Sequence, residues 1–343
     1  MPGRVHFPSE QHEDVPATEN NYVDVSATAP PDATTSIVEV PPNEFPSYFS
    51  ERNERLFHSS SSPYPLPVDT PETERLTMLH NLLRQLLGEN FVGPVPAILA
   101  PPEGSERPRM VLDVCTGNGK WVIDMAHDFP RVLFRGFDIV PIATRYPPEN
   151  VQFELTDVNA PLRWANGTFD VVHSRFVDMA VIDYHKFARE IARVMRPGGL
   201  FVSYEWSPYP AFDPSMPRNP AEHAPASTRF HEAINTALAM RGLSLLGSRV
   251  PTVLANLPSS FTDITPRVYC VPIGTWPANP PMRSAGRTCR TALERYTSSI
   301  RPLLVEGGWS DEDVDDLVAD YLSEINNVRG LVSVLYTVHA RRV

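Results

Sequence analysis

Long apolar runs are absent from this 343-residue chain. No segment approaches the roughly 18 consecutive apolar residues that a membrane-spanning helix requires. The N-terminus lacks the basic start and the apolar stretch of a signal peptide, and it is too acidic for a transit peptide. We therefore expect no membrane segment and a location in the cytoplasm or the nucleus.

Cysteine is also scarce. The chain has three cysteines, at positions 115, 270 and 289, and their spacing matches no metal-binding pattern. Such a set excludes a disulfide framework and fits a reducing compartment. Because the sequence holds no metal-ligand constellation, we expect no metal cofactor and disfavour a cation-dependent mechanism.

Positive charge is the third deficit. Lys and Arg number 30 against 41 Asp and Glu, so the formal net charge is −11. This balance argues against nucleic acid as the default partner. Much of the excess lies in residues 1–45, where eight acidic residues stand against a single arginine, Arg4. The same segment is rich in Pro, Ser, Thr and Ala and has no helical or strand period, so we expect a disordered acidic tail.

The most informative pattern that is present spans residues 111–121. It reads as an apolar strand ending near Asp113, a tight turn with Gly117 and Gly119, and a helix start. Glycines there let the backbone approach a ligand closely, and Asp138, after the next strand, can hold ribose hydroxyls. A dinucleotide site needs a third small residue where this chain has Val122. The pattern therefore predicts a nucleoside cofactor without a pyrophosphate site.

Further strands alternate with helices along the chain. We predict strands over residues 132–138, 151–157, 169–175 and 200–204, and a helix over 187–195 that ends at Arg196-Pro197-Gly198-Gly199. This alternation indicates a parallel sheet with helices on both faces, which binds ligands at the carboxyl ends of its strands. Asp113, the glycine turn, Asp138 and Asp157 all fall on that edge.

The flanking segments are mostly helical. We predict a helix from Thr70 as N-cap to Gly88 as stop, with a leucine stripe for core packing and a structural histidine, His80. Later we predict a helix that ends near Gly242, a short strand over 267–273, a capped helix that starts at Ser310 and a last strand over 331–338. Helices between the last two strands would form a lid and an acceptor pocket.

Taken together, these motifs resemble class I S-adenosylmethionine (SAM) methyltransferases, and more specifically the fungal LaeA-like, or UMTA-type, family. The resemblance runs from about residue 46 to the end and is carried by segments 64–69, 74–80, 113–126, 136–142, 169–175, 271–277 and 308–310. It implies a Rossmann-like α/β fold with a mostly parallel seven-stranded sheet, helices on both faces and an antiparallel last strand. Family members resemble either pathway enzymes of secondary metabolism or nuclear regulators that bind velvet-type partners.

The resemblance also implies the cofactor residues. Gly117 and Gly119 would line the methionine side of SAM, Asp138 the ribose and Asp157 the adenine edge. The full predicted set is Asp113, Cys115, Thr116, Gly117, Gly119, Asp138, Ile139, Asp157, Val158 and Ser174. Cys115 departs from the family pattern, which has its first glycine there. Its Cβ would either crowd the cofactor or the turn or, since Cys is small, fit if φ is negative.

A protein that catalyses methyl transfer from SAM needs no covalent intermediate, because the sulfonium already carries a good leaving group. Catalysis is mainly the in-line positioning of an acceptor, with a general base where the acceptor must lose a proton. The candidates for that base are His173, Tyr204 and Glu205. We favour His173 as a structural or cofactor-contacting residue, and Glu205, with Trp206, as a residue that shapes the pocket. Arg175 would either pair with a carboxylate such as Asp178, which we favour, or hold an anionic acceptor.

Two functions remain open from the sequence. In the first, residues 46–107 form a helical cap, 108–207 a SAM-binding core, and 208–343 a lid that encloses a small-molecule acceptor. The lid aromatics would be Trp206, Tyr209, Phe212, Phe230 and Trp276. In the second, the same fold serves as a regulator that binds protein partners through its acidic tail. The sequence does not identify the acceptor, the methylated atom or the oligomeric state.

Overall fold

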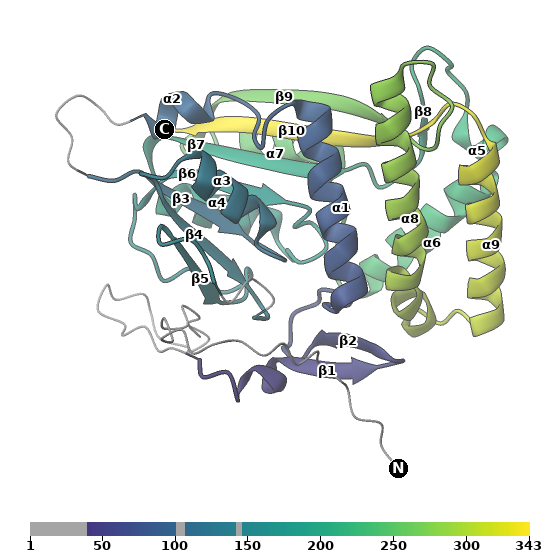
Figure 1. Ribbon diagram of the computed structural model, residues 1–343, viewed down its shortest axis with the longest axis horizontal. Helices are drawn as coiled ribbons and strands as arrows, with labels where there is room; N and C mark the ends of the chain where they lie inside the picture. The colour runs from purple at the N-terminus through teal and green to yellow at the C-terminus, as the bar shows by residue number, and fades with distance from the viewer. Residues whose placement is uncertain (1–39, 101–106, 142–145) are drawn as a thin grey trace, which may run out of the picture.

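A computed structural model describes residues 40–100, 107–141 and 146–343 (Figure 1). The acidic tail predicted for residues 1–45 lies outside the described residues as far as residue 39. Val40, the first described residue, is buried in a hydrophobic cluster on the sheet.

The centre of the molecule is the predicted parallel sheet. Its parallel strands are β3 (Met110–Val114), β4 (Leu133–Asp138), β5 (Val151–Leu155), β6 (Phe169–Arg175) and β7 (Met195–Trp206). Their order is β5-β4-β3-β6-β7, so the winding direction reverses between β3 and β6. Ligands of such sheets bind at this switch point, beyond the carboxyl ends of the strands.

The sheet closes with the expected antiparallel strand. Strand β10 (Leu331–Arg342) runs antiparallel to β7 and also to β9 (Phe261–Pro272) on its other side. These seven strands confirm the predicted Rossmann-like class. A two-residue strand, β8 (Ala211–Phe212), adds an eighth member beside the start of β10.

Helices cover both faces of the sheet because buried apolar side chains alternate along the strands. On one face, α4 (Tyr184–Val194) and α7 (Val250–Ala255) pack in one hydrophobic cluster with strand residues such as Leu112 and Phe201. On the other face, α2 (Val95–Leu99) and α3 (Lys120–Asp128) pack in a second cluster with Val111 and Phe134.

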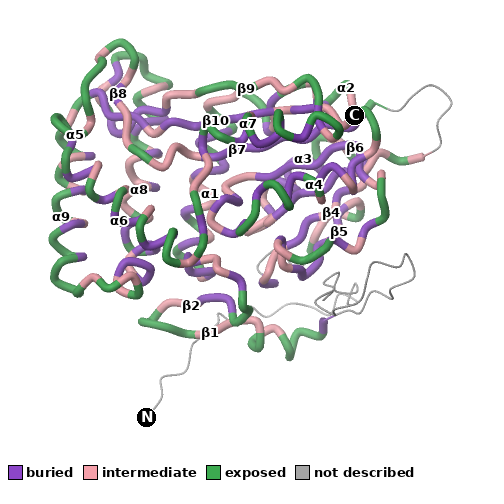
Figure 2. The backbone as a smooth tube through the Cα atoms, turned by 180° about the vertical axis from the view of Figure 1, so that it is seen from behind, coloured by how far each residue is buried: buried purple, intermediate pink, exposed green. Residues whose placement is uncertain are grey.

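A third hydrophobic cluster lies beside the sheet. It joins α1 (Thr70–Leu87), α6 (Pro225–Met240), α8 (Pro280–Glu306) and α9 (Asp311–Asn327), which stand next to one another in Figures 1 and 2. A short helix α5 (Pro220–His223) precedes α6, and a 3-10 turn (Gly247–Arg249) precedes α7. Segments more than 190 residues apart in sequence, α1 and α8, therefore lie in contact.

The N-terminal part contains a hairpin that the sequence analysis did not predict. A 3-10 turn (Phe45–Tyr48) leads into β1 (Phe49–Arg52) and β2 (Arg55–His58), which pair only with each other in the described chain. The Arg55 guanidinium forms an ion pair with Asp69, with Nε 2.5 Å from Oδ2. This ion pair ties the hairpin to the start of α1.

Several predicted element boundaries were wrong: α4 starts at Tyr184 rather than 187, β10 runs on to Arg342, and three further boundaries differ for a clear physical reason. The N-cap of α1 is Asp69, whose carboxylate accepts the Glu72 N–H, because Asp69 is the extended residue before the first turn. The segment 196–199 lies inside β7, which pairs from Met195 with Phe169. Strand β9 begins at Phe261, six residues before its predicted start, because β10 is long enough to pair with the added residues.

The capping prediction for α9 is confirmed. Ser310 is its N-cap and accepts the Asp313 N–H at 3.1 Å. Asp311, Glu312 and Asp313 fill the first turn, where carboxylates interact favourably with the helix dipole.

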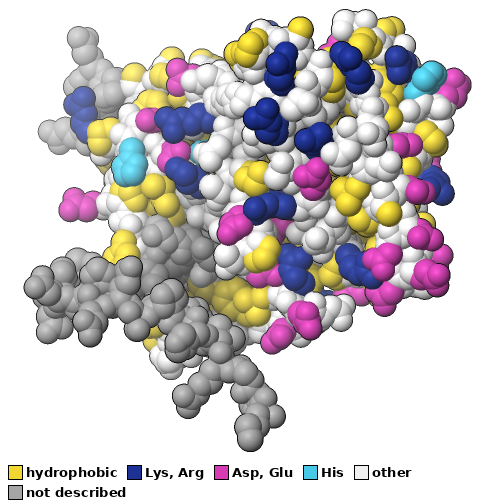
Figure 3. Space-filling view, turned by 45° about the vertical axis from the view of Figure 1, so that its right-hand side comes forward, with side chains coloured by type: hydrophobic (Ala, Val, Ile, Leu, Met, Phe, Trp, Pro, Cys, Tyr) yellow, Lys and Arg dark blue, Asp and Glu magenta, His cyan; other side chains and the backbone are white. Residues whose placement is uncertain are grey.

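Acidic side chains gather along one side of the face shown in Figure 3, while basic ones are spread over the rest of that face.

Candidate active site

The glycine turn after β3 has the backbone that its sequence requires. Gly117 and Gly119 have φ values of +57° and +72°, in the left-handed region that glycine enters without a steric penalty. Gly119 is the N-cap residue of α3, so the turn leads directly into that helix. The Thr116 hydroxyl donates to Asp113 Oδ2 at 2.7 Å and fixes the turn to the end of the strand.

Cys115 adopts a left-handed backbone conformation. Its φ is +54°, so the negative φ under which a cysteine would fit easily at this position is not adopted. A residue with a Cβ in this region carries strain of about 1–3 kcal/mol, which the surrounding structure must overcome. Its side chain nevertheless lines the cavity described below. Burial, and then the nearby carboxylate of Asp138, raises the pKa of the thiol well above its usual value, so Cys115 is a neutral group.

Asp138, at the end of β4, is bound to the turn. Its Oδ2 accepts the Gly117 N–H at 2.8 Å, and its Oδ1 accepts the Ile139 N–H at 2.8 Å. Burial raises the pKa of Asp138 to about 6. Each carboxylate oxygen has a second lone pair, and the residue lines the cavity. Asp138 therefore fits the hydroxyl pair of an adenosyl ribose.

Asp113 is held by a histidine from the neighbouring strand. His173 Nδ1 lies 2.6 Å from Asp113 Oδ1, and the imidazole stacks on Trp121 with ring centroids 3.6 Å apart. Burial lowers the pKa of His173, so the ring is neutral. The Asp113 carboxylate thus accepts bonds from Thr116 and His173, which together orient the glycine turn.

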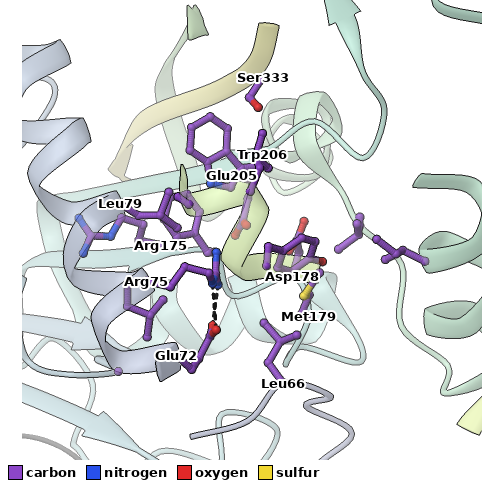
Figure 4. A pocket seen from close by; sticks show the side chains of 18 of the residues that line it. Leu66, Glu72, Arg75, Leu79, Arg175, Asp178, Met179, Glu205, Trp206 and Ser333 are labelled. Atoms are coloured by element: carbon purple, nitrogen blue, oxygen red, sulfur yellow. Dashed lines mark hydrogen bonds and ion pairs between the residues drawn. The ribbon is translucent and has the colours of Figure 1, made fainter. Parts of the chain in front are cut away.

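A cavity of about 230 Å³ lies over this turn and extends toward α8 and α9 (Figure 4). The residues of the predicted cofactor set that line it are Asp113, Cys115, Thr116, Gly117, Asp138, Ile139 and Val158. Two of the three catalytic candidates, His173 and Glu205, line it as well. The sequence-predicted site is therefore largely brought together at one edge of the sheet.

Four of the predicted site residues do not line this cavity. Gly119 lies behind the turn as the cap of α3, and Asp157 Oδ1 is occupied by Asn159, whose N–H donates at 2.9 Å. Ser174 and Tyr204 are buried in the sheet. Because successive residues of a strand face opposite sides, Glu205 reaches the cavity while Tyr204 packs with the cluster on the other face.

Helix α1 contributes charged residues to the cavity wall that were not predicted from the sequence. On α1, Glu72 and Arg75 form a buried ion pair, with Arg75 Nη2 2.6 Å and Nε 2.9 Å from the carboxylate oxygens. The Ser299 hydroxyl of α8 donates to the same carboxylate at 2.6 Å. The sequence does carry a signal for this pair. Glu72 and Arg75 lie on the same helix face as Leu79 and Leu82, and charged side chains on a buried face are rare unless they are paired.

The aromatic lining is only partly the predicted one. Trp206 and Tyr209 line the cavity, but Phe212, Phe230 and Trp276 do not. Phe230 instead stacks behind Tyr321, with centroids 4.0 Å apart. The other lining tyrosines are Tyr64 and Tyr296, from the loop before α1 and from α8. Their hydroxyl-bearing rings give an apolar wall with polar groups.

The expected pairing of Arg175 with Asp178 was wrong. Within the described residues Arg175 has no salt bridge, and its Nη1 lies 3.4 Å from His80 Nδ1. His80 in turn bonds Asp124 at 2.9 Å, and burial lowers the pKa of His80 to about 4. His80 is therefore a neutral structural residue, as predicted, and Asp178 is left to other partners.

The described residues contain neither a metal-ligand cluster nor a membrane-spanning helix. No group of three or more His, Cys, Asp or Glu side chains in the described ranges is placed to hold a metal ion. Among the described helices, none is both long and apolar enough to cross a bilayer.

Comparisons with known proteins give the same picture. Residues 84–245 match a family model described as a methyltransferase domain. The secondary metabolism regulator laeA of Coprinopsis cinerea is 29% identical over 82% of this chain and 68% of its own length. Methyltransferase pytC of Aspergillus terreus is 26% identical over 86% of this chain and 87% of its own length. The protein-methionine methyltransferase laeA of Emericella nidulans is 25% identical over 81% of this chain and 72% of its own. With the fold and the glycine turn, these matches support a LaeA-like class I methyltransferase, an enzyme that depends on SAM.

Proposed function

We propose that this enzyme transfers a methyl group from SAM to a small molecule, a secondary metabolite, bound in the same cavity. The observation that supports this most is the continuity of the cavity. It runs from the glycine turn and Asp138 to Tyr296 and Tyr321 on the helices beside the sheet. A cofactor and an acceptor can therefore meet in one enclosed space.

In this proposal the residues have distinct roles. Gly117 and its neighbours approach the methionyl part of SAM, and Asp138 holds the ribose hydroxyls. Ile139 and Val158 give the adenine an apolar surface, and residues 208–343 supply most of the acceptor wall. SAM, when bound, supplies an electrophilic methyl group on a sulfonium. The chain's own task is to hold the acceptor atom in line with that methyl and to exclude water.

A second function is favoured by the names of two relatives. The Coprinopsis cinerea relative is named a regulator of secondary metabolism, and the Emericella nidulans relative is named a protein-methionine methyltransferase. The alternative is a regulator that acts on or through proteins, with velvet-type partners and the acidic N-terminal tail as contact. Either role places the protein in the cytoplasm or the nucleus, which a fluorescent fusion would locate.

Calorimetric titration with SAM and S-adenosylhomocysteine (SAH) tests the cofactor site. The wild type and Asp316→Ala, an exposed control on α9, should bind SAH in the micromolar range. Asp138→Ala should bind about 10- to 100-fold more weakly, because hydrogen bonds to a charged group are worth roughly 1.5–3 kcal/mol. A folded wild type that binds neither compound would contradict the enzyme and leave the regulatory role.

The acceptor class is tested separately. Incubating the enzyme and methyl-labelled SAM with a fractionated fungal extract should place the label in low-mass compounds. Label that appears only in protein would support the alternative function instead. Asp138→Ala is the control in both fractions, since label that it still transfers does not come from this site.

A further inference from the structure

Two buried carboxyl groups lie next to each other in the wall of the cavity. Asp178, from the loop after β6, and Glu205, near the end of β7, both line it and are labelled in Figure 4. Their residues are only 6% and 1% exposed. Neither forms a salt bridge within the described residues, although both lie in a cavity that contains Arg75 and Arg175. A buried carboxyl pair of this kind is expensive, so a pure packing role does not account for it.

The hydrogen bonds of the pair are incomplete. Glu205 Oε1 accepts the Val177 N–H at 3.2 Å, and Asp178 Oδ2 accepts the Leu246 N–H at 3.2 Å. Glu205 Oε2 is buried and has no hydrogen-bond partner among the described residues. Because buried polar atoms are nearly always paired, this oxygen requires either a proton shared with the neighbouring Asp178 side chain or a ligand group that completes it.

The charges around the pair favour one shared proton. Burial raises the pKa of Asp178 to about 6, and burial followed by repulsion from Asp178 raises the pKa of Glu205 well above its usual value. The titratable groups that act on the pair from other elements are Tyr184 of α4, Tyr296 of α8 and Cys115 of the glycine turn. Burial raises the pKa of each, so they stay neutral. The pKa of Glu205 is raised by both burial and repulsion, so Glu205 is the member of the pair that holds the shared proton, and Asp178 is the carboxylate above its pKa of about 6.

Arg75 supplies a hydrogen-bond donor on the same cavity wall. Its Nε and Nη2 bond Glu72, while Nη1 has no hydrogen-bond partner among the described residues. The Glu72 carboxylate neutralises its charge, so the remaining N–H groups suit a carbonyl oxygen better than a free anion. The cavity thus contains a carboxylate acceptor, a carboxylic acid and a guanidinium donor.

We propose that the acceptor is a phenolic or enolic hydroxyl beside a carbonyl group, and that the Asp178–Glu205 pair takes the hydroxyl proton. This inference rests on the proposed methyltransferase function and deepens it by naming the substrate class. Arg75 holds the carbonyl oxygen, and the Asp178 carboxylate accepts the bond from the hydroxyl. The proposal makes Asp178 a catalytic residue and Glu205 the residue that keeps its charge in place.

The step balances without any further reactant. The hydroxyl oxygen forms a bond to the methyl carbon, and the carbon–sulfur bond breaks with its electron pair left on sulfur as SAH. The hydroxyl proton passes to Asp178. The positive charge of the sulfonium is lost as the carboxylate is neutralised, so the closed cavity holds no new net charge.

The test uses two matched probes, 2′-hydroxyacetophenone and 2′-aminoacetophenone, which both carry a carbonyl beside the acceptor group and differ only in the acceptor heteroatom; the phenol keeps its proton at neutral pH. SAH formation and SAH affinity are measured for the wild type, Asp178→Asn, Glu205→Gln and the exposed control Asp316→Asn. The wild type and the control should methylate the hydroxyl probe and leave the amine. Asp178→Asn should be at least about 100-fold slower, as expected for the loss of a general base, with SAH affinity within about threefold of wild type. The wild-type rate should rise with pH through about 6, and the variant should lack this rise.

The possible results distinguish failure of the proposed methyltransferase function from failure of the proposed substrate class. A wild type that does not bind SAH contradicts the proposed function itself. A wild type that binds SAH but methylates the amine as well as the hydroxyl probe, or neither, overturns the substrate class. Asp178→Asn and Glu205→Gln that both bind SAH and keep the wild-type rate and pH profile overturn the proton-accepting role. Both substitutions are isosteric, so if one variant does not fold, the other decides.

Discussion

The imidazole of His173 lies 2.6 Å from the Asp113 carboxylate and is stacked on Trp121 of α3. This one side chain connects β6, the glycine turn after β3 and the helix that follows the turn. From its position in the sequence, His173 is a candidate for a general base, a cofactor-contacting residue or a structural residue. Its low pKa and its bond to Asp113 support the structural alternative, with a role in orienting the cofactor turn.

Replacing His173 by Phe should keep the stack on Trp121 and lose the bond to Asp113. A buried carboxylate that loses a partner costs roughly 1–3 kcal/mol, so we expect the free energy of unfolding to fall by that amount. Urea unfolding measures it, and His185→Phe, at an exposed position of α4, is the control. A variant as stable as the wild type would show that the bond contributes nothing to folding.

Cys115→Gly should relieve backbone strain. The φ of +54° favours glycine by about 1 kcal/mol or more, partly offset by the greater freedom of glycine in the unfolded chain. We expect a melting temperature equal to or above that of the wild type, and SAH affinity at least as high, since a Cβ leaves the cavity wall. Cys115→Ala keeps the Cβ and should show neither gain; equal behaviour of the two variants would contradict the strain argument.

Glu205→Gln should change how stability depends on pH. The pKa of this carboxyl is higher in the folded than in the unfolded chain, so the folded state binds its proton more tightly. Its contribution to stability is present below the unfolded pKa of about 4.3 and is lost as pH rises above it. The variant should therefore gain stability relative to the wild type between pH 5 and pH 8 in thermal unfolding. A constant difference across this range would argue against a raised pKa.

Tyr321→Phe removes a buried hydroxyl that has no hydrogen-bond partner among the described residues. The ring and its stack on Phe230 remain. We expect the free energy of unfolding to stay level or to rise by about 1 kcal/mol, because no bond is lost and a desolvation cost disappears. Tyr321→Ala should instead lose about 3–5 kcal/mol through the cavity that it leaves. Destabilisation of the Phe variant by more than about 1 kcal/mol would reveal a partner for the hydroxyl.

Several features of the site follow from local rules alone. Apolar runs that end in Asp113 and Asp138 indicate buried parallel strands, and glycines between a strand and a helix indicate a tight turn. Since the carboxyl ends of such strands share one edge, the cofactor side of the site could be predicted. The alternation of side chains along a strand also separates Glu205 from Tyr204, a distinction that the sequence analysis did not draw.

The sequence by itself determined the doubly wound sheet, the position of the glycine turn and the acidic residue beside it, because each depends on neighbours a few residues away. Only the tertiary structure decided the acceptor side of the cavity. Its wall combines Arg75 of α1, Glu205 of β7 and Tyr296 of α8, whose contact depends on long-range packing of helices around the sheet. The positive φ of Cys115 and the contact between Asp178 and Glu205 were also decided by the tertiary structure. Local preferences disfavour both arrangements, and packing from several elements holds each in place despite its cost in free energy.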